Sequence, residues 1–111
     1  MLYMDSGNKK YTVKIQDPAT NMLIYHTRFL AQVSESAAQR LVEEFYSKAK
    51  TLEYMPERCP WLTDDIIPRN KYRKLVFNKR YMLVFQVKGD KVYIDAIVDC
   101  RQDYSWLLHY T

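Results

Sequence analysis

The chain has 111 residues, of which 48% are hydrophobic and 14% aromatic, so we predict a single domain over residues 1–111 whose core needs no metal or disulfide. No apolar run reaches the length of about 18 residues that suggests a membrane span, and no signal peptide is recognisable, so we expect a soluble cytoplasmic protein. The net charge of +4 is uneven, because residues 66–111 hold 9 basic and 4 acidic side chains and residues 1–65 hold 8 and 9. This excess favours a polyanionic or acidic partner.

The first half of the chain predicts a strand and a helix. Residues 1–10 have the composition of a flexible extension, and "YTVKI" at residues 11–15 alternates apolar and polar side chains as a strand does. Asp17-Pro18 suits the start of a helix, which we expect to end near Val33. The residues expected on its buried stripe are Met22, His26, Phe29, Leu30 and Val33. His26 is therefore predicted to be a packed, hydrogen-bonded core residue.

A second helix is predicted to follow almost at once, with Ser34 or Ser36 as its cap and Pro56 beyond its end. Its apolar positions recur at steps of three and four residues: Ala38, Leu41, Val42, Phe45, Ala49 and Leu52. Because the link between the helices is short, we expect them to form an antiparallel hairpin.

The second half predicts a loop and three strands. The apolar residues expected to hold the loop at 56–70 against the core, or alternatively to line a groove for a partner, are Trp61, Ile66 and Ile67. Strands are expected at residues 72–77, 81–87 and 92–98, with turns at 78–79 and 89–90. The order strand, helix, helix, strand, strand, strand predicts an α+β fold, an antiparallel β-sheet with an αα-hairpin packed on one face.

Metal and cofactor motifs are not recognisable in the sequence. Cys59 and Cys100 are far apart, and with His26 and His109 they match no usual zinc-ligand spacing. We therefore expect free thiols, no metal site and no cofactor.

An ordered set of segments lies within residues 11–107: "YTVKI", "MPERCPWL", "KYRKLVFNKRYMLVFQV", "KGDKVYIDAIV" and "DCRQDY". Together they resemble the RelE/ParE superfamily of toxins from bacterial type II toxin–antitoxin modules. The resemblance implies the fold derived above and a growth-inhibiting toxin. It also implies a cognate antitoxin that wraps the toxin with an acidic and apolar segment. RelE-like members cut mRNA on the ribosome without a metal, whereas ParE-like members inhibit DNA gyrase by binding it.

For an mRNA-cleaving relative, the resemblance implies catalytic positions in this chain. Arg73 and Arg101 stand at such positions and would stabilise the charge of the transition state, with Arg80 as a nearby substitute for charge that the strands lack. Tyr104 or His109 would transfer protons.

Lys74 and Lys79 would add RNA-binding charge. The alternative for these lysines, and for Arg73 and Arg80, is a set of edge charges that prevent sheet-to-sheet aggregation.

Three positions depart from the RNA-cleaving pattern, since Leu75, Met82 and Gln102 stand where it carries basic residues. If Met82 faces the open side of the sheet, Arg80 shares that face and replaces part of the lost charge. We therefore predict a toxin of this superfamily, with a preference for a ribosome-associated mRNA endonuclease. The alternatives are a ParE-like gyrase inhibitor and a degenerate toxin that only binds its antitoxin.

Overall fold

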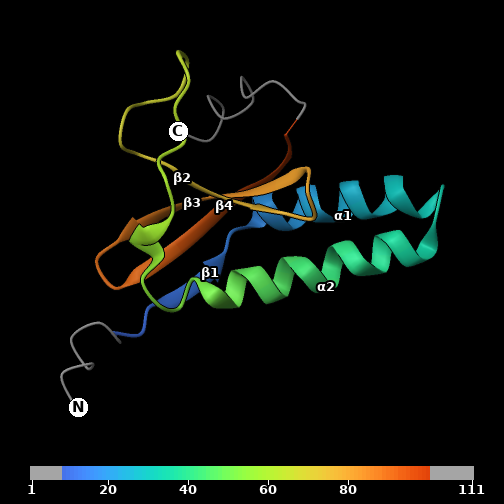
Figure 1. The fold of residues 1–111 in the computed structure, drawn as a ribbon, viewed down its shortest axis with the longest axis horizontal. Helices are drawn as coiled ribbons and strands as arrows, with labels where there is room; N and C mark the ends of the chain where they lie inside the picture. Colours follow the sequence, from blue (N-terminus) through green and yellow to red (C-terminus); the bar gives the residue numbers. More distant parts are fainter. Residues whose placement is uncertain (1–8, 101–111) are drawn as a thin grey trace.

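The computed structural model describes residues 9–100, and its helices and strands follow the predicted order (Figure 1). The elements are β1 (Thr12–Ile15), α1 (Asp17–Ala31), α2 (Glu35–Thr51), the 3-10 helix η2 (Pro56–Arg58), β2 (Arg73–Phe77), β3 (Tyr81–Lys88) and β4 (Lys91–Asp99). The α+β class, the element order and the helical hairpin are confirmed. Of the predicted flexible extension, residues 1–8 lie outside the described part, and Lys10 forms a β-bridge with Tyr54. No helix within residues 9–100 is long and apolar enough to cross a membrane.

The sheet is mixed, which differs from the fully antiparallel sheet that we predicted. Its order is β1-β4-β3-β2, with antiparallel β2–β3 and β3–β4 pairs and a parallel β1–β4 pair. The helical hairpin returns the chain to the start of β1, where the Tyr11 amide donates to the Glu53 carbonyl at 2.7 Å. β2 and β3 then form an antiparallel pair, and β4, antiparallel to β3, runs in the same direction as β1.

The helical hairpin has well-defined ends. The Ser34 hydroxyl oxygen caps α2 by accepting a hydrogen bond from the Ala37 amide at 3.1 Å, as one of the two predicted serines should. The cap of α1 is Gln16, so Asp17 and Pro18 fill the first helical positions, and the acidic Asp17 still suits the positive end of the helix dipole.

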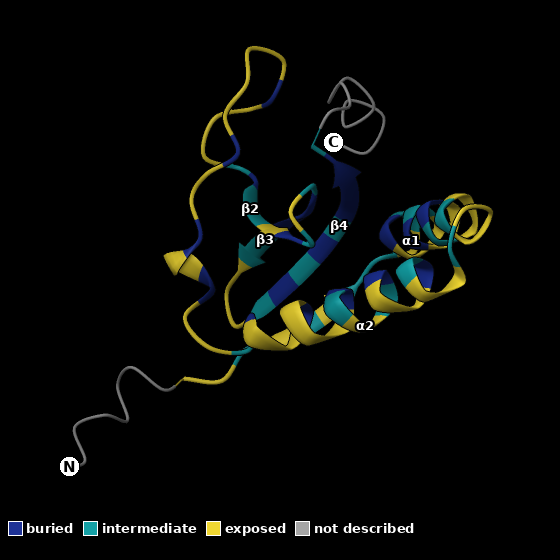
Figure 2. Cartoon of the chain, turned by 45° about the vertical axis from the view of Figure 1, so that its right-hand side comes forward, coloured by how far each residue is buried: buried dark blue, intermediate teal, exposed yellow. Residues whose placement is uncertain are grey.

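Two apolar clusters lie on opposite faces of the sheet. Figure 2 shows the two helices on one side of the strands and the loop before β2 on the other. The helix-side core joins the hairpin to the sheet, and its members include Leu23, Leu41, Phe45, Phe77, Leu83, Phe85, Ile94 and Ile97. The loop-side core consists of Leu62, Ile67, Tyr72, Met82, Val84, Ala96 and Val98. The sheet is thus covered by helices on one face and partly by the loop before β2 on the other.

The buried stripe of α1 differs from the prediction. His26 is buried, as predicted, but Phe29 is 55% exposed and Val33 is 83% exposed. The helix ends at Ala31, and the chain then turns into α2, which leaves Val33 outside the core. In the loop, Ile67 is buried as predicted, whereas Trp61 and Ile66 are exposed.

Both predicted hairpin turns are present. Asn78 and Lys79 have φ values of 50° and 63°, and Gly89 has a φ of 62°. Positive φ at turn residues is the backbone of a tight turn that matches the twist of paired strands.

Candidate functional site

Arg73, a predicted catalytic residue, is bound by the loop before β2. Its guanidinium lies over the Trp61 ring at 3.7 Å, and Nη1 donates hydrogen bonds to the carbonyls of Glu57 and Cys59 at 3.1 and 2.7 Å. A guanidinium on an aromatic face with two carbonyl acceptors is a stable arrangement. Arg73 thus fastens the η2 segment to the start of β2.

Arg80 lies at the other end of the β2–β3 ladder, directly after the turn. Its Nη2 is 3.4 Å from the Tyr81 hydroxyl, and its Nε is 3.9 Å from the Asp99 carboxylate. Asp99 is 9% exposed, so this partly buried carboxylate compensates the charge of Arg80.

The two arginines lie at opposite ends of β2. Arg73 begins β2, and Arg80 follows the turn after Phe77, where β2 ends. At 3.3 Å per residue, the strand between them is about 13 Å long. A phosphorane-like transition state needs fixed charges around one group, whereas each of these two guanidiniums is held by protein groups at its own end of the strand.

The two uncharged positions on the strands lie in the cores. Met82 is 3% exposed in the loop-side core, and Leu75 packs against the helix-side core. They therefore face opposite sides of the sheet, and the side of Met82 is covered rather than open. Their apolar character is required by packing.

The remaining predicted site residues have different positions. Lys79 is exposed in the β2–β3 turn, and Lys74 is half-buried on β2, where its amide donates to the Pro60 carbonyl at 3.0 Å. Arg101, Tyr104 and His109 lie outside the described residues, and their roles stay predictions.

His26 is the centre of a polar cluster between α1 and the sheet. Its Nε2 lies 2.9 Å from the Ile97 carbonyl, so this nitrogen carries the proton and donates it. The ring meets that of Tyr81 edge-on, at a centroid distance of 5.2 Å. Burial lowers the pKa of His26, although its hydrogen bond to Ile97 and the charge of Asp99 act in the opposite direction. A buried neutral histidine of this kind is a structural donor.

The two described thiols are not activated, and the acidic side chains of residues 9–100 form no metal-binding group. Burial raises the pKa of Cys59 and of Cys100, both of which are free cysteines. In the part of the chain that is described, no three His, Cys, Asp or Glu side chains gather as metal ligands would.

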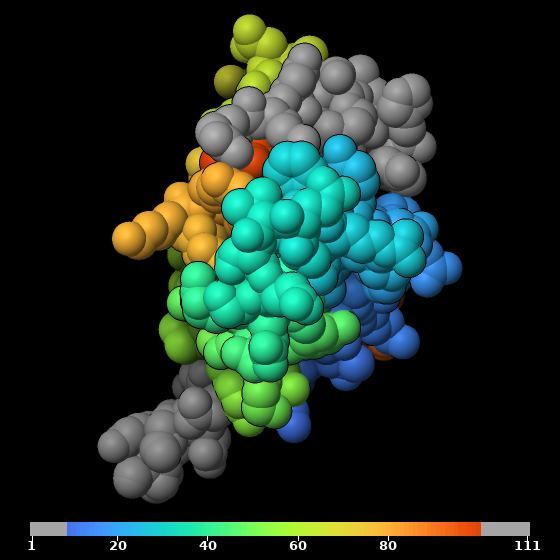
Figure 3. Space-filling view, turned by 90° about the vertical axis from the view of Figure 1, so that its right-hand side faces the viewer, coloured from blue at the N-terminus to red at the C-terminus, as the bar shows by residue number. Residues whose placement is uncertain are grey.

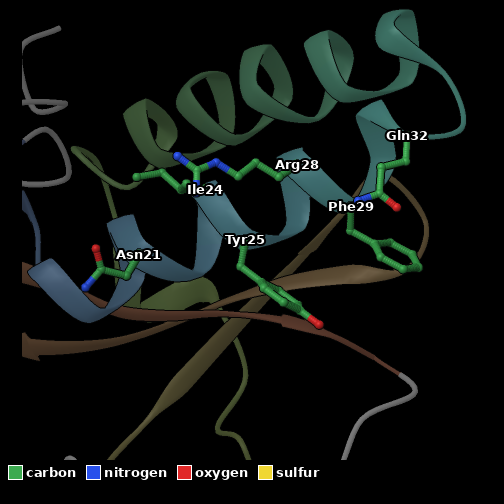
Figure 4. A pocket seen from close by; sticks show the side chains of 6 residues that line it. All are labelled: Asn21, Ile24, Tyr25, Arg28, Phe29 and Gln32. Atoms are coloured by element: carbon green, nitrogen blue, oxygen red, sulfur yellow. The ribbon is translucent and has the colours of Figure 1, made fainter.

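The outer face of α1 carries a concave surface. Its lining residues recur with helical spacing: Asn21, Ile24, Tyr25, Arg28, Phe29 and Gln32. Figure 4 shows Tyr25 and Phe29 pointing toward the sheet side of the helix, and Arg28 extending along α1 toward Ile24. The hollow measures about 460 Å³, and the hairpin that carries it faces the viewer in Figure 3.

This α1 face combines apolar area with positive charge. Ile24, Tyr25 and Phe29 are 42%, 63% and 55% exposed, and Arg28 lies among them. Large apolar side chains gathered in this way on an exposed helix mark a protein-binding surface. We did not predict this face, because the sequence placed Phe29 in the core. One feature of the sequence could have indicated this face: α1 has more apolar residues than a single buried stripe can hold, so some of them must be exposed.

Comparison with known proteins decides the family. Residues 13–104 match the family described as "ParE toxin of type II toxin-antitoxin system, parDE". The chain belongs to the ParE toxin family. The predicted RelE/ParE membership is therefore confirmed, and the chain is the toxin of a type II toxin–antitoxin module with an antitoxin as partner.

A solved ParE-type structure has the same fold. It is described as the chromosomal ParDE TA system from P. aeruginosa, with a TM-score of 0.66 and 16% sequence identity. The alignment covers 82% of this chain and 97% of that chain. None of the curated proteins matches the sequence.

Proposed function

We propose that this toxin acts by binding DNA gyrase and inhibiting it, without cutting mRNA. The observation that carries this proposal is the separation of Arg73 and Arg80 by the length of β2, each engaged by neighbouring protein groups. Membership of the ParE family, whose members inhibit gyrase, supports the same target. The preference for an mRNA endonuclease that we drew from the sequence gains no support from these positions.

We further propose that the antitoxin occupies the α1 face defined by Ile24, Tyr25, Arg28 and Phe29. An amphipathic segment would bury its apolar side chains against Ile24, Tyr25 and Phe29 and place an acidic side chain beside Arg28. This surface suits the acidic and apolar segment that the family resemblance implies.

The target is tested with purified toxin in two assays. We expect supercoiling by gyrase to be inhibited and mRNA in a translating extract to remain intact, and we expect added antitoxin to restore supercoiling. Cleavage of mRNA within codons, lost in Arg101→Ala, would instead support the ribonuclease function. Inactivity in both assays would indicate a degenerate toxin.

The antitoxin site is tested by truncating its aromatic side chains. Tyr25→Ala and Phe29→Ala should each weaken antitoxin binding by about 2 kcal/mol, or roughly 30-fold, as measured by calorimetry. Tyr46→Ala on α2 is a matched control, because Tyr46 is 52% exposed but lies outside the α1 face. Equal losses from Tyr25→Ala and Tyr46→Ala would refute the assignment.

A further inference from the structure

Part of the sheet face opposite the helices is polar and lies beyond the loop-side core. Val13, Val92 and Phe85 belong to the helix-side core or pack against it, so their strand neighbours point the other way. These neighbours define a lysine face, made of Lys14 on β1, Gln86 and Lys88 on β3, and Lys91 and Tyr93 on β4.

The lysines of this face come from separate strands that the sheet places next to one another. Lys88 is directly opposite Lys91 in the β3–β4 ladder, and Lys14 is directly opposite Tyr93 in the β1–β4 ladder. Like charges directly opposite each other on one face are unfavourable. Lys91 has an ion pair with Asp90 at 3.4 Å, but both groups are well exposed, so this pair offsets little of the repulsion.

The acidic group nearest the centre of the face has a hydrogen bond of its own. Gln86 Nε2 donates to the Asp95 carboxylate at 2.6 Å. Burial raises the pKa of Asp95, while this hydrogen bond and the charges of Lys88 and Lys71 lower it. The ammonium group of Lys71 lies 5.3 Å above the Tyr72 ring and adds a fourth positive charge at the border of the face.

The composition of the lysine face differs from that of a protein-binding surface. None of the large hydrophobic side chains that the described residues expose belongs to it. Its aromatic residue, Tyr93, is half-buried, so the face lacks the stacking platform that single-stranded nucleic acids need. Lysines spread over adjacent strands suit the regularly spaced phosphates of a duplex.

We propose that the lysine face binds the phosphate backbone of duplex DNA without sequence preference. This goes beyond gyrase inhibition and does not depend on it, since it concerns a contact between the toxin and DNA itself. The face lies on the opposite side of the sheet from the helical hairpin, so an antitoxin on the α1 face leaves it accessible.

The test is fluorescence anisotropy of the full chain with a labelled duplex of arbitrary sequence at several salt concentrations. Three phosphate contacts predict a slope of about −2.7 in log affinity against log salt, or about a 40-fold loss between 50 and 200 mM salt. The variant K14Q/K88Q/K91Q should bind at least about ten-fold more weakly at the lower salt, with a slope near zero.

The matched control is R40Q/K48Q/K50Q, which removes the same charge from exposed positions on α2. It should retain most of the affinity and the slope of the wild-type chain. Equal losses in the two triple variants, or no binding at low salt, would overturn the proposal. A polyglutamate probe that binds the lysine face as tightly as the duplex would also overturn it, in favour of an acidic protein partner.

Discussion

The two faces of the sheet are covered in different ways: two regular helices pack on one face, and an irregular loop packs on the other. On the helix side, α1 and α2 supply regularly spaced side chains such as Leu23, Leu41 and Phe45. On the other side, an irregular loop supplies Leu62, Ile67 and Tyr72, and it covers only part of the face. The part that the loop leaves uncovered is the lysine face. The helices expose apolar side chains of α1 on their outer face, whereas the partial cover by the loop leaves charged side chains exposed on the sheet itself.

We expect the largest loss of stability from a substitution in the helix-side core. Phe45 is fully buried, so Phe45→Ala should lower the free energy of unfolding by about 3–5 kcal/mol. Met82→Ala in the loop-side core should cost less, about 2–3 kcal/mol, because an irregular loop relaxes more easily into the space left. Urea titrations of both variants measure this difference. A larger loss from Met82→Ala would show that the loop, rather than the hairpin, dominates stability.

The polar cluster beneath α1 should make stability depend on pH. The pKa of His26 is lowered from 6.5, so below that pH the unfolded chain takes up a proton that the folded chain does not. The free energy of unfolding should therefore fall as pH decreases below about 6.5, by at most about 1.4 kcal/mol per pH unit. His26→Gln keeps a donor toward Ile97 and should abolish this dependence. An unchanged slope in the variant would assign the effect to other groups.

We expect a smaller loss of stability at Arg58, which links η2 to the end of α2 and the residues that follow it. Arg58 Nη1 donates to the carbonyls of Tyr54 and Met55 at 3.0 and 3.1 Å, and Nη2 donates to the Thr51 hydroxyl at 3.0 Å. Arg58→Ala should cost about 1 kcal/mol, because the side chain is exposed and water replaces part of these bonds. Thermal unfolding measures the loss, and Arg58→Lys, which keeps only the charge, should recover little of it.

We expect the smallest change in stability from a substitution at Tyr72 in the loop-side core. Tyr72 is fully buried, and its hydroxyl has no hydrogen-bond partner among residues 9–100. Tyr72→Phe should therefore change the free energy of unfolding by less than about 1 kcal/mol, toward greater stability. A loss well above that value in a urea titration would reveal a partner for this hydroxyl.

The sequence predicted the helices and strands, whose apolar residues recur at regular spacing. It did not predict which exposed side chains would remain uncovered by other parts of the fold. The helical hairpin, the strand meander and the buried His26 followed from spacing and turn residues. The exposure of Phe29 did not, because two apolar stripes on α1 look alike until one of them meets the sheet. The contacts of Arg73 with Trp61 and of Arg80 with Asp99 join residues distant in sequence, and no local pattern carries them.

The parallel pairing of β1 with β4 has a consequence for the order of folding during synthesis. Thr12 pairs with Lys91, a partner about 80 residues later, so the sheet cannot close until nearly all of the described chain has left the ribosome. The helical hairpin, which is built from local contacts, can form well before that point. The lysine face needs β1, β3 and β4 together, whereas the α1 face needs only the hairpin. An antitoxin that recognises the α1 face would thus meet its binding surface before the toxin is complete.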